Sequence, residues 1–264
     1  MTATASRRRT RRAGGWIAGP SHGSTPALRL FCLPYVGGAA WTFEPWRGLL
    51  GEDVELCTVE LPGRGSRMRE PAFSRMGALV EALASAVTDE LDVPYALYGH
   101  SMGSLVAFEL TRELRRRGLP EPQVLFASGG PAPRLSGQRM AVHRPEVHRA
   151  TDEQVIARLL SLGGLPEEVM AEPALLKAFL PAIRADFAVF ETYEYRPERL
   201  LGCPIVVLTG RDDAEVPPAH SLPWSRETTG PAEHRVLPGG HFFLRSAQEE
   251  VLAIVRHALE GAKR

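Results

Sequence analysis

Apolar residues along this chain fall into two kinds of pattern that alternate through its first half. Short, nearly continuous apolar runs predict buried strands at residues 28–33, 54–60, 94–98 and 123–128. Helical spacing of apolar residues predicts helices between them, at residues 41–50, 73–91 and 104–117. Strands that alternate with helices in this way predict an α/β fold, with a mainly parallel sheet covered by helices on both faces.

The alternation stops between about residues 139 and 199, where the sequence shows no convincing strand pattern. Helical patterns take its place at residues 152–162, 167–170 and 174–195. Thr151 stands where the first of these helices would be capped, and Pro181 interrupts the last. We therefore expect a helical insertion, or lid, over the sheet.

Beyond the insertion, strand patterns return at residues 205–208 and 234–237, and a helical pattern follows at 249–262. A chain of 264 residues suits one α/β domain with an insertion. We expect this single domain to span residues 25–264, with the lid at about 139–199.

Residues 1–24 stand apart because five of the first twelve residues are arginine. An export signal would follow such charges with an apolar core of about 7–15 residues. The segment after these arginines is instead short, rich in glycine and broken by Pro20. We therefore expect residues 1–24 to form a mobile tail, which Trp16 and Ile17 anchor to the domain.

Charge and cysteine content narrow the possible functions. Lys plus Arg and Asp plus Glu both number 31, and the balance gives no support for binding to nucleic acid or an anionic membrane. No apolar stretch approaches the roughly 20 residues that span a bilayer. The three cysteines are odd in number and lack metal-ligand spacing. We expect buried, reduced thiols, no metal site and a cytoplasmic location.

Positive charge is nevertheless concentrated at one point of the chain. Four arginines gather near the end of the predicted helix 104–117, at positions 112, 115, 116 and 117. Because cations suit this end of a helix dipole, we expect a solvated face there. Docking of an acidic partner is the alternative.

The sequence G-H-S-M-G at residues 99–103 carries the first candidate chemistry. It follows a predicted strand and opens a predicted helix, which is the context of a nucleophile elbow. Gly99 and Gly103 lack the Cβ atoms that would collide in so tight a turn, so Ser101 would be held with its hydroxyl exposed. The alternative is a glycine-rich helix start in which Ser101 only caps the helix.

A nucleophilic serine needs a base to take its proton, and the base needs an orienting carboxylate. On this kind of sheet the acid and then the base follow the serine, on loops that leave later strands. His241 fits the base best, because it lies on a glycine-rich loop after the last predicted strand. Asp213 is favoured as the acid, because the spacing G-x-x-D carries it past the turn that Gly210 begins. Asp212 and then Glu215 are the alternatives.

Attack on a carbonyl group creates an oxyanion, which two backbone N–H groups can stabilise. One donor should be Met102, directly after the candidate nucleophile at the start of a helix. The other should come from the loop after the strand at 28–33, with Val36 favoured and Tyr35 second. The glycine pair at 37–38 would let this loop approach a substrate.

Five stretches of the chain together resemble the type II thioesterases that accompany polyketide synthases and nonribosomal peptide synthetases. They are L-P-Y-V-G-G at 33–38, L-P-G-R-G-S-R at 61–67, G-H-S-M-G at 99–103, G-R-D-D at 210–213 and G-G-H-F-F-L at 239–244. The similarity runs from about residue 28 to 255. The P-G-R-G-x-R and G-G-H-F-F segments are much more specific to this family than the serine motif.

This resemblance implies an α/β-hydrolase fold and a role for each matching residue. Ser101 would be the nucleophile, Asp213 the acid and His241 the base. The oxyanion donors would be Met102 and Val36. The resemblance thus assigns the same five residues that the motifs and their order favour.

The resemblance also places Tyr35 and Phe242 next to the substrate. Tyr35 departs from the family pattern, because histidine often stands there, and this puts the acyl pocket in question. Ala214 is a second departure, where proline commonly follows the acid. Neither departure removes a catalytic group.

The implied substrate is an acyl group on the phosphopantetheine arm of a carrier protein. The implied role is housekeeping: a monomeric enzyme without a cofactor of its own acts in trans and releases stalled or wrongly loaded acyl groups from a synthase. A general carboxylesterase or lipase would use the same triad. A non-catalytic binding protein on the same scaffold is the alternative of another class, and it predicts a missing or misplaced triad member.

Overall fold

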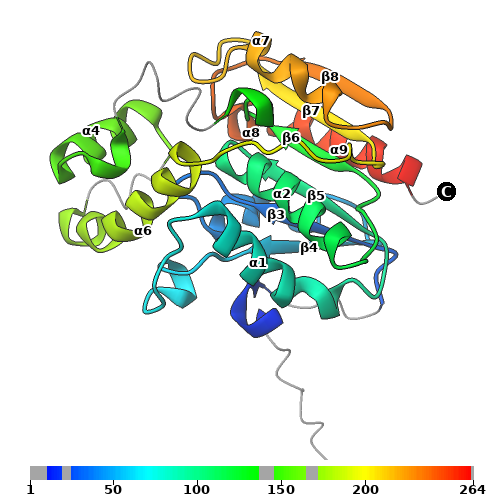
Figure 1. Cartoon of the computed structure of the whole chain (residues 1–264), viewed down its shortest axis with the longest axis horizontal. Coiled ribbons are helices and arrows are strands. Elements are labelled where there is room, and N and C mark those ends of the chain that lie inside the picture. Colours follow the sequence, from blue (N-terminus) through cyan, green and yellow to red (C-terminus); the bar gives the residue numbers. More distant parts are fainter. Residues whose placement is uncertain (1–10, 20–24, 137–145, 165–171, 263–264) are drawn as a thin grey trace, which may run out of the picture.

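The computed structural model describes residues 11–19, 25–136, 146–164 and 172–262. An eight-stranded sheet with the order β1-β2-β4-β3-β5-β6-β7-β8 lies at its centre (Figure 1). The strands are β1 Arg11–Arg12, β2 Ile17–Ala18, β3 Leu28–Leu33, β4 Val54–Val59, β5 Tyr95–His100, β6 Leu125–Ser128, β7 Ile205–Gly210 and β8 Ala232–Leu237. All pairs from β4 to β8 are parallel, while β1 and β2 pair antiparallel at one edge. The predicted α/β class is confirmed.

Helices cover both faces of this sheet. They are α1 Met76–Val87, α2 Met102–Arg116, α4 Asp152–Leu162, α6 Pro173–Glu191, α7 Pro218–Ser221, α8 Phe243–Ser246 and α9 Gln248–Ala262. Alternation along β3 assigns its side chains to two cores: Phe31 and Leu33 pack with α1 and α2, and Leu30 and Cys32 pack with α9. No described helix is both long and apolar enough to cross a membrane.

Part of the predicted tail over residues 1–24 lies against the domain, and Trp16 and Ile17 anchor it there as expected. Residues 11–18 lie at the edge of the sheet, where Ile17 pairs with Val59 of β4. Trp16 is buried, stacks on Phe73 at a centroid distance of 6.1 Å, and carries the Arg67 guanidinium 4.0 Å above its ring. The remaining tail positions, 1–10 and 20–24, lie outside the described residues.

The insertion lies to one side of the sheet and consists mainly of α4 and α6 (Figure 1). The predicted cap of α4 is confirmed: Thr151 and Gln154 form a reciprocal capping box, and Gly163 ends the helix in the left-handed conformation with φ 72°. The expected interruption at Pro181 is wrong, because α6 continues through it. The two helices share an apolar core with members on both sides of the proline, including Leu180. The predicted helix at 167–170 lies outside the described residues.

The arginines of α2 hold the chain that returns from the insertion. Arg112 donates to the carbonyl oxygen of Arg196 at 2.6 Å, and Arg115 donates to those of Arg199 and Leu200 at 2.9 and 3.0 Å. Only 2% of the Arg112 residue is exposed. The expected solvated face is therefore wrong for Arg112. The guanidinium groups of Arg112 and Arg115 bond to backbone carbonyl groups in a segment that lies outside the strands of the sheet.

A buried ion pair joins the insertion to the loop after β4, and both of its side chains also bond to the backbone of the loop after β3. Arg64 donates to both carboxylate oxygens of Asp186 in α6, at 2.6 and 2.7 Å, and to the carbonyl oxygen of Gly38 at 2.8 Å. Asp186 also accepts the N–H of Gly37 at 2.9 Å. Both side chains are almost fully buried. Arg64 belongs to the P-G-R-G-x-R segment, and this contact gives that segment a structural role.

We predict that Arg64→Met lowers the free energy of unfolding by about 3–5 kcal/mol, because it leaves the buried Asp186 carboxylate without its partner. Replacing both groups, as Arg64→Met with Asp186→Leu, should restore most of this loss. Urea denaturation measures both effects. The control is Glu44→Gln, which removes an exposed pair with Arg47 and should change stability by about 0–1 kcal/mol. An equal loss of unfolding free energy in Arg64→Met and in the control would contradict the structural role of the buried Arg64–Asp186 pair.

Candidate active site

Ser101 occupies a strained turn between β5 and α2. Its φ of 55° is the only positive φ of a non-glycine residue in the described part of the chain. Such a conformation costs on the order of 1–3 kcal/mol and persists only where the surroundings enforce it. The Ser101 N–H donates to the carbonyl oxygen of Ser128 at 2.7 Å, which ties the turn to the next strand.

The glycines on either side of Ser101 are required by space. A Cβ on Gly99 would lie 2.1 Å from the carbonyl oxygen of Gly103, and one on Gly103 would lie 2.3 Å from that of Leu33. Backbone atoms at such distances cannot yield as a flexible side chain would. The turn is thus closed by direct backbone contact with the end of β3, as the elbow prediction requires.

The structure brings Ser101, His241 and Asp213 together in one chain of contacts. His241 Nε2 lies 3.0 Å from Ser101 Oγ, and His241 Nδ1 lies 2.8 Å from Asp213 Oδ2. The three residues follow β5, β7 and β8, whose carboxyl ends meet at one edge of the parallel sheet. Residues far apart in sequence meet there because parallel strands present their following loops at the same edge.

The surroundings of Asp213 orient its carboxylate. Its side chain is fully buried, and Oδ1 accepts the N–H groups of Glu215 and Val216 at 2.8 and 2.9 Å. The other oxygen can accept the Nδ1–H of His241, and in that tautomer of the neutral ring Nε2 is free to accept the hydroxyl proton of Ser101.

The other acid candidates lie elsewhere. Asp212 is exposed, and its backbone N–H bonds to Gly239. Glu215 pairs with Arg158 of α4, with one contact at 3.0 Å. Among the residues that the structure describes, neither carboxylate forms a hydrogen bond with His241.

The proposed oxyanion donors lie on two segments that touch. Met102 begins α2, where the first N–H groups of a helix have no partner within the helix. Val36 lies in a turn that the N–H of Gly38 closes onto Tyr35 at 2.8 Å, with Gly37 at φ 76°. This turn follows β3, whose end contacts Gly103. The two segments are therefore adjacent, as a shared pair of oxyanion donors requires.

Tyr35 and Phe242 form a wall beside the triad. Their ring centroids are 4.8 Å apart with an angle of 68° between the planes, and the centroid of the Phe242 ring lies 5.1 Å from that of His241. The Tyr35 hydroxyl donates to the carbonyl oxygen of Gly164 at 2.7 Å and accepts from Arg245, which also donates to Gly164. Burial raises the pKa of the Tyr35 hydroxyl. The departure from histidine at this position thus supplies a bond to the end of the α4 segment.

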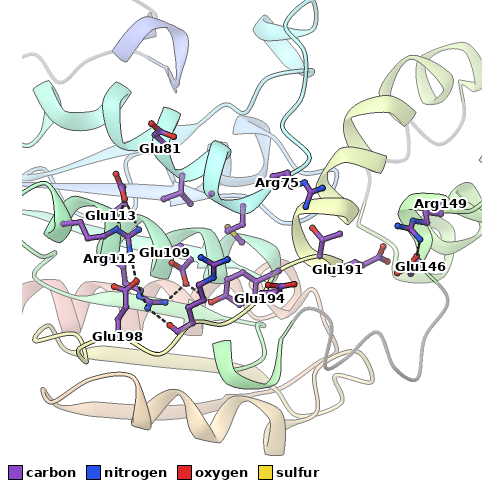
Figure 2. Close-up of a pocket in the computed structure, with 17 residues that line it drawn as sticks. Arg75, Glu81, Glu109, Arg112, Glu113, Glu146, Arg149, Glu191, Glu194 and Glu198 are labelled. Atoms are coloured by element: carbon purple, nitrogen blue, oxygen red, sulfur yellow. Dashed lines mark hydrogen bonds and ion pairs between the residues drawn. The ribbon is translucent and has the colours of Figure 1, made fainter.

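A hollow of about 990 Å³ lies between α1, α2, the end of α6 and the returning chain. Figure 2 shows that charged side chains line it, and several of them bond to one another, as Arg112 does to Glu109 and Glu198. None of the predicted site residues lines this hollow. Within the described residues, no cluster of three or more histidine, cysteine or acidic side chains could hold a metal ion.

Sequence reasoning missed two groups next to the site. His100 has no role in the sequence-based assignment, yet its ring bonds to the backbone carbonyl oxygen of His241 at 3.0 Å. A histidine at the end of a buried strand, directly before the serine, is a signal that could have found it. Asp186 was missed because nothing in a helical pattern indicates which distant loop a carboxylate will reach.

Comparisons with known proteins agree with one another. A family model described as a thioesterase domain matches residues 28–259. The gramicidin S biosynthesis protein GrsT of Aneurinibacillus migulanus is 34% identical, over 90% of this chain and 91% of that protein. The thioesterase PikA5 of Streptomyces venezuelae is 35% identical, over 90% of this chain and 83% of that protein. The solved structure of RedJ, a thioesterase from the prodiginine pathway of Streptomyces coelicolor, is 34% identical with a TM-score of 0.82, over 98% of this chain and 96% of that one.

We predict that Ser101→Ala lowers the turnover of a p-nitrophenyl ester by about 10⁴–10⁶, because no other described group stands in its place. Labelling with a fluorophosphonate, read by intact-protein mass, should give one adduct on the unchanged protein and none on the variant. The control is Ser225→Ala, an exposed serine that should change neither result. A loss of less than tenfold in Ser101→Ala would mean that the nucleophile is misassigned.

Substitution of the two neighbouring aspartates separates the acid candidates. We expect Asp213→Asn to lower kcat by about 10⁴, because an amide at this place favours the wrong tautomer of His241. Asp212→Asn should leave kcat within about threefold, as exposed substitutions usually do. Steady-state kinetics on the same ester measures both. Greater damage from Asp212→Asn would reverse the assignment.

Proposed function

Because the chain belongs to the thioesterase family, we propose that it hydrolyses acyl groups from the phosphopantetheine arm of carrier proteins. The observation that carries this proposal is the Ser101–His241–Asp213 chain of contacts in a sequence that matches the thioesterase model over nearly its whole domain. GrsT and RedJ, two of the similar proteins, are named for gramicidin S and prodiginine biosynthesis. Their names support a substrate held on a biosynthetic synthase.

In the proposed mechanism Ser101 Oγ attacks the thioester carbonyl carbon while His241 Nε2 takes the hydroxyl proton. The carbonyl oxygen becomes an oxyanion, which the N–H groups of Met102 and Val36 stabilise. Asp213 stays ionised and holds the Nδ1 proton of the imidazolium that forms. The tetrahedral intermediate collapses, the C–S bond breaks, and the thiol of the carrier arm leaves with the proton from His241.

The second half of the reaction restores the enzyme. A water molecule attacks the acyl-serine ester while His241 again takes a proton, and a second oxyanion forms on the same two N–H groups. The intermediate releases the carboxylic acid, and Ser101 recovers its proton from His241. The arm belongs to the substrate, so these steps require no cofactor of the enzyme.

The acyl chain would lie between the catalytic loops and the insertion. Val36 packs against the apolar core formed by α4 and α6, so the proposed oxyanion loop and the lid share one apolar surface. Phe242 and Tyr35 extend that surface beside His241. Apolar surfaces of this kind bind acyl chains through burial rather than through directional bonds.

We assign the enzyme an editing role: it acts in trans on carrier domains of a polyketide or nonribosomal peptide synthase and clears stalled or wrongly loaded acyl groups. A cytoplasmic location accords with the three buried cysteines, none of which forms a disulfide. The monomeric state remains a prediction of the sequence.

The decisive comparison is between acyl-carrier thioesters and simple esters. We expect kcat/KM for short acyl groups on a phosphopantetheinylated carrier protein to exceed that for p-nitrophenyl esters of the same acids by about tenfold or more, because contacts with the carrier add binding energy to the transition state. A panel from acetyl to hexanoyl on one carrier would show the chain preference. Hydrolysis of esters with no action on the acyl-carrier would favour a general carboxylesterase. Absence of both activities would favour a binding protein.

A further inference from the structure

The ring of His100 contacts two other strands of the sheet or the loops that follow them. His100 is the last residue of β5 and is fully buried. Its Nδ1 lies 2.9 Å from the hydroxyl oxygen of Ser128, at the end of β6. Its Nε2 lies 3.0 Å from the backbone carbonyl oxygen of His241, in the loop after β8. The proposed mechanism uses neither contact.

The hydrogen-bond partners of His100 determine which of its ring nitrogens carries the hydrogen. A carbonyl oxygen can only accept, so His100 Nε2 must carry a hydrogen. The Tyr98 hydroxyl donates to Ser128 Oγ at 2.7 Å, which leaves the Ser128 hydroxyl proton for His100 Nδ1. The bonds thus run in one direction, from Tyr98 through Ser128 and His100 to the carbonyl group of His241. Burial lowers the pKa of His100 well below its usual range, in agreement with a neutral ring.

This arrangement connects two parts of the site that the sheet does not join. β6 and β7 lie between β5 and β8, so no ladder hydrogen bond links the serine turn to the loop of His241. That loop contains two glycines, and Gly239 has φ 100°, a conformation open to few other residues. The His100 bond fastens the loop at His241 itself, next to Ser101.

Two adjacent residues therefore hold His241 at two points. His100 bonds to its backbone carbonyl, and Ser101 contacts its ring nitrogen at 3.0 Å. The ring of His100 also packs edge-on against Phe243, with centroids 5.4 Å apart, which restricts its rotation. A shift of the loop would move the base away from the hydroxyl it must deprotonate, and displacements of about 1 Å can cost about 10²-fold in rate.

We propose that His100 is a positioning residue, which sets the distance between the nucleophile and the base through the hydrogen bond from its Nε2 to the carbonyl oxygen of His241. This inference rests on the proposed function only in taking Ser101 and His241 as the reacting pair. It assigns His100 no contact with substrate and no proton transfer in the reaction.

The test compares two amides at position 100. The side-chain amide of Gln can place a donor where His100 Nε2 lies, whereas that of Asn reaches only as far as Nδ1. We expect His100→Asn to lower kcat by about 10–10²-fold with KM within about threefold, because the base is misplaced while substrate contacts remain. His100→Gln should recover most of that loss. The assay uses the full chain and any ester or thioester whose hydrolysis by the unchanged protein is abolished by Ser101→Ala.

The matched control is His234→Asn on β8. This histidine is partly buried and bonds to Thr209 at 2.9 Å, and burial lowers its pKa as it does that of His100. It contacts neither Ser101 nor His241 in any described interaction. Its kcat should stay within about twofold of the unchanged protein. Thermal unfolding of all variants separates a lost fold from a misplaced base.

Equal kcat in His100→Asn and the unchanged protein would overturn the proposal, and so would an equal loss in the Asn and Gln variants. If His100→Asn does not fold, His100→Leu replaces it: leucine fills part of the buried space but has no hydrogen-bond donor, and kcat should again fall by about 10–10²-fold. An unchanged kcat in that variant would also overturn the proposal. Failure of the proposed function appears separately, as a lack of activity on acyl-carrier thioesters in the unchanged protein.

Discussion

The backbone of Ser101 sets the constraint on which the rest of this structure depends. A side-chain-bearing residue is held at φ 55°, and its turn is so tight that Gly99 and Gly103 meet backbone atoms at distances no Cβ could tolerate. Such strain is stable only in a rigid setting. The setting is the middle of the sheet: β5 lies between β3 and β6, and α2 is buried along most of its length. The turn also places Met102 at the start of a helix, where its N–H is free of the helix ladder.

Much of this arrangement follows from local sequence pattern. Buried parallel strands are easily predicted because they are apolar along their whole length. The strand-turn-helix context of Ser101 can be recognised from the residues immediately before and after it. The order of serine, acid and histidine follows in turn from the order of the strands. The choice between Asp212 and Asp213 was harder, because adjacent residues differ only in the direction of their side chains, and that direction depends on the N–H groups of residues 215–216.

The features that sequence did not predict depend on distant contacts. Pro181 lies inside α6 because tertiary packing on both sides of it outweighs the hydrogen bond that proline removes. Arg112 is buried because it bonds to the carbonyl group of Arg196, more than eighty residues further along the chain. Trp16 and Ile17 anchor the N-terminal segment as the sequence predicts, but the pairing of Ile17 with Val59 as part of the sheet was not predicted. In each case the contacting residues lie far away in the sequence, whereas hydrophobic periodicity reflects only neighbouring positions.

The way in which α2 holds the returning chain has an evolutionary consequence. Arg112 and Arg115 bind residues 196, 199 and 200 through their carbonyl oxygens, which every amino acid possesses. Substitutions among those three residues therefore leave the path of the segment intact, whereas loss of either arginine does not. The sequence of the insertion can therefore change to accommodate other acyl groups. Residues 196–200, where the chain leaves the insertion, stay attached to α2, which begins beside Ser101. In this segment the side chains of residues 196, 199 and 200 can diverge, whereas their backbone and the Glu198 carboxylate, which pairs with Arg112, are constrained.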